Sequence, residues 1–232
     1  MTQEEIVYEL FSKEIVKYGR GSIVYGTYEK GVSDMDFLSI VDNSCHPLLD
    51  EFPKHEYQYK HEPTSLFRMP TEDYFKPLDT LEFSFMCEDD FLKMIENNDI
   101  AALECIFAYK AWGGAYEKYY EAFKLDKWKL RQSVSAICSN SWVKAKKKLT
   151  VEKDYNLRVA QKSLWHSMRL YMFAIQIAQY GEIYNFTVAN DLWEEIKNAE
   201  TPTWEYYKEK YQAKFNELRS DLVKLCDRPK EE

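Results

Sequence analysis

Asp34 and Asp36 are the residues of this chain whose types and spacing point most directly to chemistry. They lie one residue apart before the apolar segment FLSIV at 37–41, which we expect to form a strand. Side chains two positions apart leave a strand on the same face, so both carboxylates would point the same way. Like charges held this close repel unless a cation lies between them, and carboxylate oxygens suit Mg²⁺. The pair therefore predicts a magnesium site, although Asp-x-Asp is also common in turns, where Asp34 would only cap or bend the chain.

The loop before these aspartates is rich in glycine. Four of the seven glycines of the chain lie within residues 19–42. Gly21 and Ser22 predict a tight turn in which backbone N–H groups can approach a phosphate, and the Ser22 hydroxyl adds a further donor. The segment is therefore interpreted as a loop that holds the triphosphate of a nucleotide beside the metal.

The elements that must position these residues can be predicted from hydrophobic periodicity. In the segment 80–86, Leu81, Phe83 and Phe85 alternate with Glu82 and Ser84, which predicts a half-buried strand. The first half of the chain predicts a helix over 3–17, strands over 37–41 and 80–86, a further strand near 55–61, and a helix over 88–109 with a break near 97–99.

The second half predicts helices almost throughout. The glycine pair at 113–114 is the best candidate for a boundary between domains. We therefore expect an α+β protein, with a small mixed-sheet domain over 1–112 followed by an all-helical domain over 115–232. The helices are expected at 115–123, 127–149, 155–180, 189–198 and 203–226.

Composition excludes several classes of protein. The longest apolar run, LYMFAIQIA, is far shorter than the roughly 20 residues that a membrane helix needs. The N-terminal segment MTQEEIVYEL is acidic and lacks the layout of a signal peptide. The five cysteines are scattered and form no Cys-x-x-Cys pair, which favours reduced thiols over disulfides or a zinc site. These features predict a cytoplasmic protein that makes no use of a membrane.

Charge is distributed unevenly along the chain. Residues 1–114 carry a net charge of −12, and residues 115–232 carry +4. Within 127–169 there are 11 basic and two acidic residues. The first half is therefore expected to hold cations and the second half to meet an anion, with the two halves facing each other across a cleft.

The segment GSIVYGTYEKGVSDMD resembles a motif of the DNA polymerase β-type nucleotidyltransferase superfamily. It is most similar to a bacterial and phage group of predicted nucleotidyltransferases with the pattern Gly-Ser-x-x-Tyr-Gly-Thr…Ser-Asp-x-Asp. The segments 82–107 and 161–182 are similar to later parts of that group, so the resemblance covers most of residues 19–182. The chain departs from the group in a loop after Thr27 that is one residue longer, in Glu82 where Asp is usual, and in Asp99-Ile100 where Asn-Pro is usual.

The resemblance implies a mechanism and a set of site residues. Asp34 and Asp36 would bind two Mg²⁺ ions together with a nucleoside triphosphate, and Glu82 would complete one metal site and help to deprotonate the acceptor hydroxyl. Glu56 is the competing third carboxylate, and Glu82 could also be only the polar face of its strand. A nucleoside monophosphate would be transferred with release of pyrophosphate. The nucleotide-binding residues implied in the motif are Gly21, Ser22, Thr27 and Ser33.

A basic stripe is predicted on the helix over 155–180. Arg158, Lys162, His166 and Arg169 recur at intervals of four, four and three, which places them on one helical face. Such stripes are usually solvated, but this one lacks interleaved acidic partners. We therefore expect Lys162, His166 and Arg169 to contact the triphosphate or the acceptor. The run KAKKK at 144–148 is either a solvated helix end or the place where an RNA acceptor binds.

Two further functions are compatible with the sequence. One is a non-catalytic module that binds nucleotide or RNA on a nucleotidyltransferase fold. The other is a helical interaction protein whose charges are only surface. The two aspartates and Glu82 favour the enzyme, whose acceptor could be a nucleic acid, a protein or a small molecule.

Overall fold

The computed structural model describes residues 3–29, 32–33, 35–50, 58–61, 81–111 and 117–228. They form two compact units. The first comprises Met1–Ile95 and Glu104–Ala122, and the second comprises Glu96–Leu103 and Phe123–Glu232. The domain boundary predicted at 113–114 lies outside the described residues and stays a prediction.

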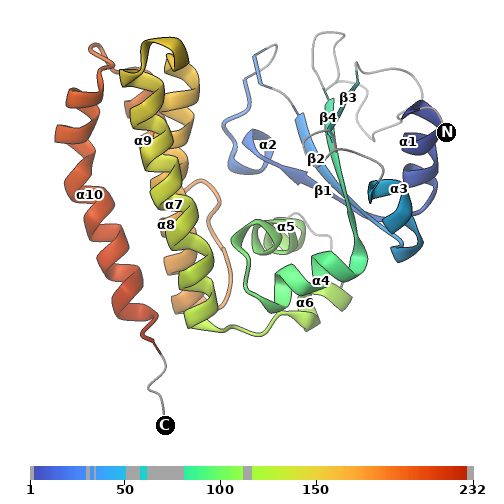
Figure 1. Ribbon diagram of the computed structural model, residues 1–232. Coiled ribbons are helices and arrows are strands. Elements are labelled where there is room, and N and C mark those ends of the chain that lie inside the picture. The colour runs from blue at the N-terminus through green and yellow to red at the C-terminus, as the bar shows by residue number, and fades with distance from the viewer. Residues whose placement is uncertain are drawn as a thin grey trace. The chain divides into compact units, whose positions relative to one another are not determined.

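The first unit contains a mixed four-stranded sheet with short helices around it (Figure 1). The strand order is β1-β2-β4-β3; β2 runs parallel to β4, and the other two pairs are antiparallel. Helices follow this sheet along the chain, so the expected α+β class is confirmed. In chain order, the described elements up to Ala122 are α1 (Gln3–Ser12), β1 (Glu14–Arg20), α2 (Ser22–Tyr25), β2 (Met35–Val41), a 3₁₀ turn η1 (Asn43–Cys45), α3 (His46–Asp50), β3 (Gln58–His61), β4 (Leu81–Cys87), α4 (Glu88–Glu96), α5 (Ile100–Ala111) and α6 (Glu117–Ala122).

The start of the chain differs from the prediction. The helix expected over 3–17 ends at Ser12, and Glu14–Arg20 forms β1 instead. The β-branched pair Ile15 and Val16 favours a strand, and the alternate residues Val16 and Tyr18 are buried. Backbone pairing with β2 then outweighs the helical spacing of the apolar residues. The other strands predicted in this unit and the helix break near 97–99 are confirmed.

The two faces of the sheet are covered by different helices. Phe37 of β2 stacks on Phe83 of β4 at 5.3 Å between ring centroids, and Phe11 of α1 packs edge-on against Phe83 at 5.1 Å. On the opposite face, Tyr18 of β1 packs against Phe91 of α4 at 5.5 Å. Because side chains alternate along a strand, the residues that precede Phe37 and Phe83 project to the face of Tyr18.

The second unit is helical and matches the prediction to within two residues at each helix end. Its elements are α7 (Lys127–Thr150), a 3₁₀ turn η2 (Glu152–Asp154), α8 (Leu157–Tyr180), α9 (Asn190–Lys197) and α10 (Trp204–Leu225). Most of α8 is buried. Trp142 of α7 packs on Phe215 of α10 at 4.5 Å, and Tyr171 of α8 packs on the same ring at 5.5 Å. The apolar side of α10 therefore packs inward within this unit. In the part of the chain that the structure describes, no helix is long and apolar enough to cross a membrane.

Asn98, between α4 and α5, combines strained backbone with a buried polar side chain. It has φ 53° and is fully buried. Its Nδ2 donates to the carbonyl of Lys124 at 3.0 Å, and its Oδ1 accepts from the backbone N–H of Asp126 at 2.9 Å. The side chain therefore ties the residues before α5 to the N-terminus of α7.

We expect Asn98→Ala to lower the free energy of unfolding by about 2–3 kcal/mol. The change removes the hydrogen bonds to the Lys124 carbonyl and the Asp126 N–H, and it places alanine, which cannot form local side-chain hydrogen bonds, in left-handed backbone. Asn98→Gly removes the same hydrogen bonds but relieves the strain of the left-handed backbone. The free energy of unfolding should therefore fall by about 1 kcal/mol less than in Asn98→Ala. Urea denaturation of the three proteins measures both effects. Equal losses for the two variants would show that the backbone of Asn98 contributes no strain.

Candidate active site

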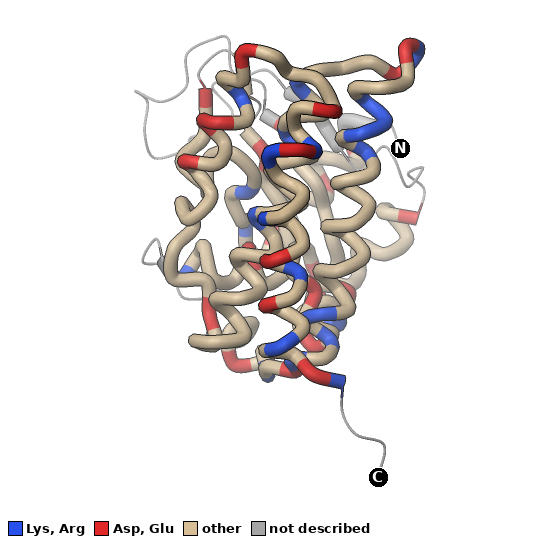
Figure 2. The backbone as a smooth tube through the Cα atoms, turned by 90° about the vertical axis from the view of Figure 1, so that its left-hand side faces the viewer, with Lys and Arg blue, Asp and Glu red and all other residues tan. Residues whose placement is uncertain are grey.

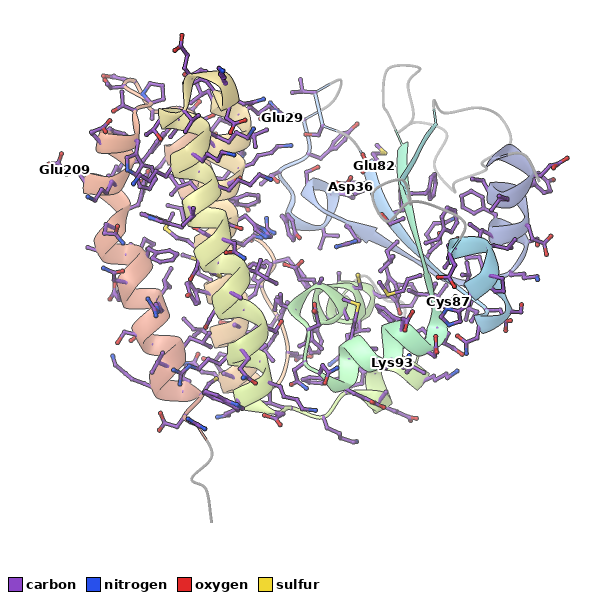
Figure 3. All side chains as sticks on the ribbon, viewed as in Figure 1. Glu29, Asp36, Glu82, Cys87, Lys93 and Glu209 are labelled. Carbon is purple, nitrogen blue, oxygen red and sulfur yellow. The ribbon has the colours of Figure 1, made fainter. Side chains whose placement is uncertain are left out.

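Asp36 and Glu82 are brought together by the parallel pairing of β2 with β4. Asp36 is the register partner of Glu82 on one side and of Arg20 on the other, so the three residues form one row across three strands. Asp36 and Glu82 are both half-buried, and Figure 3 shows them on the adjacent strands. They project to the face opposite Phe37 and Phe83, away from α1. The row therefore places two carboxylates side by side on a sheet face.

Gly21 lies directly against the carboxylate of Asp36. It has φ 66° and ψ −142°, a backbone conformation that favours glycine. A Cβ at this position would overlap Oδ2 of Asp36. The predicted turn at Gly21 and Ser22 is present, and Ser22 begins the single-turn helix α2. The sequence therefore uses glycine where backbone must approach a carboxylate closely.

Thr27 and Ser33, the remaining described residues of the motif, both help to hold the loop between α2 and β2. The backbone N–H of Thr27 donates to the carbonyl of Ser22 at 2.9 Å, which keeps Thr27 beside the Gly21 turn. Ser33 is buried, and its Oγ accepts from the backbone N–H of Glu29 at 3.1 Å, so Ser33 braces the loop. The carboxylate predicted at Asp34 and the competing Glu56 lie outside the described residues. Of the predicted set in this unit, the structure brings Gly21 against Asp36 and Asp36 beside Glu82, while Thr27 is hydrogen-bonded to Ser22 in the turn.

Arg20 is part of this row and was missed by the sequence analysis. Burial alone lowers the pKa of Arg20, but nearby Cys105, Glu104, Tyr25 and Asp36 raise it overall. Tyr25 Oη in turn donates to Glu104 Oε2 at 3.0 Å, which links α2 to α5. The signal was the alternation of Val16, Tyr18 and Arg20 along β1, which was obscured because a helix was expected there. A fixed cation therefore stands next to the two carboxylates of the sheet.

The donor set of Asp36 and Glu82 fits Mg²⁺. Both are hard carboxylate ligands, and Mg²⁺ is usually held by one or two carboxylates together with water and substrate phosphates. Their shared register on neighbouring strands puts their Cβ atoms at about 5 Å, within reach of one ion or of two adjacent ions. The row therefore supports the part of the predicted metal site that the structure describes, namely Asp36 and Glu82.

A second acidic group lies at the other end of β4 and has a different explanation. His46 Nε2 lies 2.8 Å from Asp89 Oδ1, and Asp90 is close to both. Lys93 Nζ contacts Asp89 at 3.3 Å and Asp90 at 3.0 Å (Figure 3 labels Lys93). Lys93 thus already contacts both carboxylates, and exposed acidic groups are common without an ion, so this group carries no argument for a metal.

The basic stripe on α8 becomes progressively more buried along the helix. Arg158 and Lys162 are exposed, His166 is half-buried, and Arg169 is 3% exposed. Arg169 Nη2 lies 3.0 Å from His166 Nδ1, and its guanidinium stacks over Trp165 at 4.4 Å. These residues belong to the second unit, whereas Asp36 and Glu82 belong to the first. Their convergence on one triphosphate stays a prediction.

His166 is held in its neutral form. Burial lowers its pKa to about 3, and the charges of Arg169 and Lys144 act in the same direction. Because Nδ1 faces the guanidinium of Arg169, which can only donate, the proton of the neutral ring lies on Nε2. The imidazole is therefore a hydrogen-bond donor at neutral pH and adds no charge to the basic stripe.

We expect His166 to make the stability of the protein fall in acid. Its pKa is about 3 in the folded state, whereas an unfolded histidine has a pKa of about 6.5. Between these values the unfolded chain binds more protons, so the contribution of neutral His166 is complete above about pH 6.5 and decreases as the pH falls toward 3.

His166→Gln should therefore remove part of the loss of stability between pH 7 and pH 4. Urea denaturation at several pH values measures the difference in unfolding free energy between the wild type and this variant, which should shift in favour of the variant as the pH falls. Lys162→Gln, on the same helix, is the control and should show no such trend. A difference independent of pH for His166→Gln would contradict the assignment of a neutral, buried imidazole.

No protein-family model and no curated protein matches this chain. Its function therefore has to follow from the residues themselves.

Proposed function

We propose that the chain is a magnesium-dependent nucleotidyltransferase. It transfers a nucleoside monophosphate from a nucleoside triphosphate to a hydroxyl acceptor, and pyrophosphate leaves. The observation that carries this proposal is the pairing of Asp36 with Glu82 across two parallel strands, with the backbone of Gly21 directly against the Asp36 carboxylate. Glycine backbone beside paired carboxylates is an arrangement that suits a metal-bound phosphate chain.

Two Mg²⁺ ions, held by Asp34, Asp36 and Glu82, would supply charge neutralisation for the attacking and leaving oxygens. The residues of the chain would contribute by positioning the triphosphate and the acceptor. The turn at Gly21 and Ser22 would hold the triphosphate through backbone N–H groups and the Ser22 hydroxyl. Thr27 and Ser33 would support the same loop.

The transfer needs one proton acceptor. The acceptor hydroxyl forms a bond from its oxygen to the α-phosphorus, and the bond from that phosphorus to the pyrophosphate oxygen breaks. Pyrophosphate leaves with the electron pair, and the hydroxyl proton passes to the carboxylate of Glu82. Lys162, His166 and Arg169 would bind the anionic triphosphate or the acceptor through charge and through the Nε2 proton of His166.

The test is incubation of the purified protein with each α-labelled nucleoside triphosphate, Mg²⁺ and a cell lysate. We expect label on RNA, protein or a small molecule, and its loss in the variant Asp34→Ala/Asp36→Ala. Label that persists in this variant would contradict the proposal. Absence of label, combined with a rise in melting temperature on adding nucleotide in the presence of chelator, would instead identify a module that binds nucleotide without turnover.

A further inference from the structure

We propose that the turn between α7 and α8 binds the phosphate backbone of single-stranded nucleic acid. This surface, here termed the basic corner, is formed by the end of α7, the turn η2 and the first turns of α8. Its cations are Lys144, Lys146, Lys147, Lys153, Arg158 and Lys162, all of them exposed. The binding does not depend on catalysis; it rests on the proposed function only in that the bound strand would then be the hydroxyl acceptor.

The basic corner has a strong excess of positive charge. Residues 144–162 contain only two acidic residues, Glu152 and Asp154. Asp154 is already engaged, since its carboxylate contacts Lys147 at 2.7 Å and Lys148 at 4.0 Å. Figure 2 shows a stretch of blue on the tube at the upper right, at the end of α7 next to the turn η2. A surface of this kind attracts a polyanion.

Another helix of the same unit shows what a merely solvated surface looks like. The residues of α10 include five cations and four carboxylates. Red and blue alternate along this helix, which faces the viewer in Figure 2 and leads to the C-terminus. Within the helix, Lys224 lies 2.9 Å from Asp221. The charges of α10 therefore compensate one another, in contrast to those of the basic corner.

The positions of the cations relative to the helix dipoles also favour an anionic ligand. Lysines at the end of α7 are favoured by the negative end of its dipole, so they alone could serve stability. Arg158 and Lys162 lie in the first two turns of α8, where the dipole is positive and no acidic residue occupies the first turn. The helix dipole therefore does not favour cations at that end, whereas an anionic ligand would.

The basic corner also offers a surface for a base. Tyr155 lies in the turn between η2 and α8, and its side chain is 57% exposed. An exposed aromatic ring among cations is the combination with which proteins bind single strands, because each base can stack on the ring while the phosphates meet the cations. An acidic protein would use the charge but not the ring, so nucleic acid is the partner that fits better.

The experiment measures binding of fluorescent 12-nucleotide single strands, one of RNA and one of DNA, by anisotropy in the presence of chelator. We expect binding that weakens with salt and a shallower salt dependence in Lys146→Gln/Lys153→Gln/Arg158→Gln. Each lost phosphate contact should reduce the slope of log K against log salt by about 0.7, and the triple variant should bind at least about tenfold more weakly. The matched control is Lys208→Gln/Lys214→Gln/Arg219→Gln, which removes the same charge from exposed positions of α10.

The outcomes separate this proposal from the proposed enzyme activity. Equal weakening by the two triple variants, or competition by polyglutamate as effective per charge as by the nucleic acid, would overturn the proposal. So would the absence of binding to either strand at low salt. None of these results bears on transfer of nucleotide to another acceptor. Weakening confined to the basic corner supports the proposal, and the comparison of RNA with DNA then shows which strand the protein prefers. Tyr155→Ala should weaken binding without changing the salt slope.

Discussion

Asp36→Asn is expected to reduce nucleotidyl transfer by at least about 10³-fold while the protein stays folded. The amide keeps the size of the carboxylate but loses its charge, and a metal site of two or three carboxylates cannot hold its ions without it. Metal ions contribute several kcal/mol of charge stabilisation in the transition state, and each 1.36 kcal/mol corresponds to a factor of ten in rate. Transfer of label from an α-labelled triphosphate measures the loss.

The stability of the same variant provides a second readout. Asp36 is next to Glu82 in the row, so removal of one charge relieves repulsion between the two carboxylates. It also deprives Arg20 of a neighbouring negative charge, and the two effects oppose each other. Because these two effects oppose each other, we expect the unfolding free energy to change by less than about 1 kcal/mol. A folded variant that retains transfer would show that Asp36 takes no part in the reaction.

Two comparisons make the result specific to the row. Glu82→Gln should lose activity on the same scale, and the double variant should lose little more, because residues that act as a unit are not additive. Asp90→Asn removes a carboxylate from the surface of α4, in the same unit, where it contacts Lys93. That variant should keep full activity.

The helical half of the fold was predictable because its signals are local. Helices such as α7 and α8 are long, their apolar residues recur at helical spacing, and Asn156 and Gly181 cap the two ends of α8. None of this depends on distant parts of the chain. The strand β4 was equally clear, since Phe83 and Phe85 alternate with polar residues.

The misassigned strand β1 shows where local signals fail. Residues 14–20 fit a helix when read with the preceding turns, and only pairing with β2 makes them a strand. Because the register of that pairing cannot be predicted from local sequence, the position of Arg20 opposite Asp36 could not be predicted either. The contribution of Glu104 from α5 could not be predicted for the same reason, since it depends on which helix covers that face of the sheet.

The pairing of Asp36 with Glu82 lies between these two cases. Each residue was singled out from its own strand, but their common register is a property of the sheet alone. A shift of one residue in either strand would have placed one carboxylate on the opposite face, among the phenylalanines. The parallel register that aligns Phe37 with Phe83 in the core therefore also aligns the two carboxylates.

Gly21→Ala is expected to lower the unfolding free energy by about 2–4 kcal/mol and to reduce transfer at least about 10²-fold. Its backbone conformation, φ 66° and ψ −142°, is one that residues with a Cβ rarely adopt, at a cost of about 1–3 kcal/mol. In addition, the new methyl group would overlap the Asp36 carboxylate, whose short side chain can yield only by rotating out of the row. Denaturation and label transfer measure the two effects separately.

Gly181→Ala is the matched control, and a double variant isolates the contact. Gly181 also has positive φ, 81°, but nothing lies within 4 Å of the position that its Cβ would take. Its substitution should therefore cost only about 1 kcal/mol of backbone strain and leave activity unchanged. In an Asp36→Ala background the overlap disappears, so Gly21→Ala should cost less there than in the wild type. An equal cost in both backgrounds would mean that Gly21 serves the turn alone; a smaller cost would show that glycine is required at this position because a carboxylate lies against it.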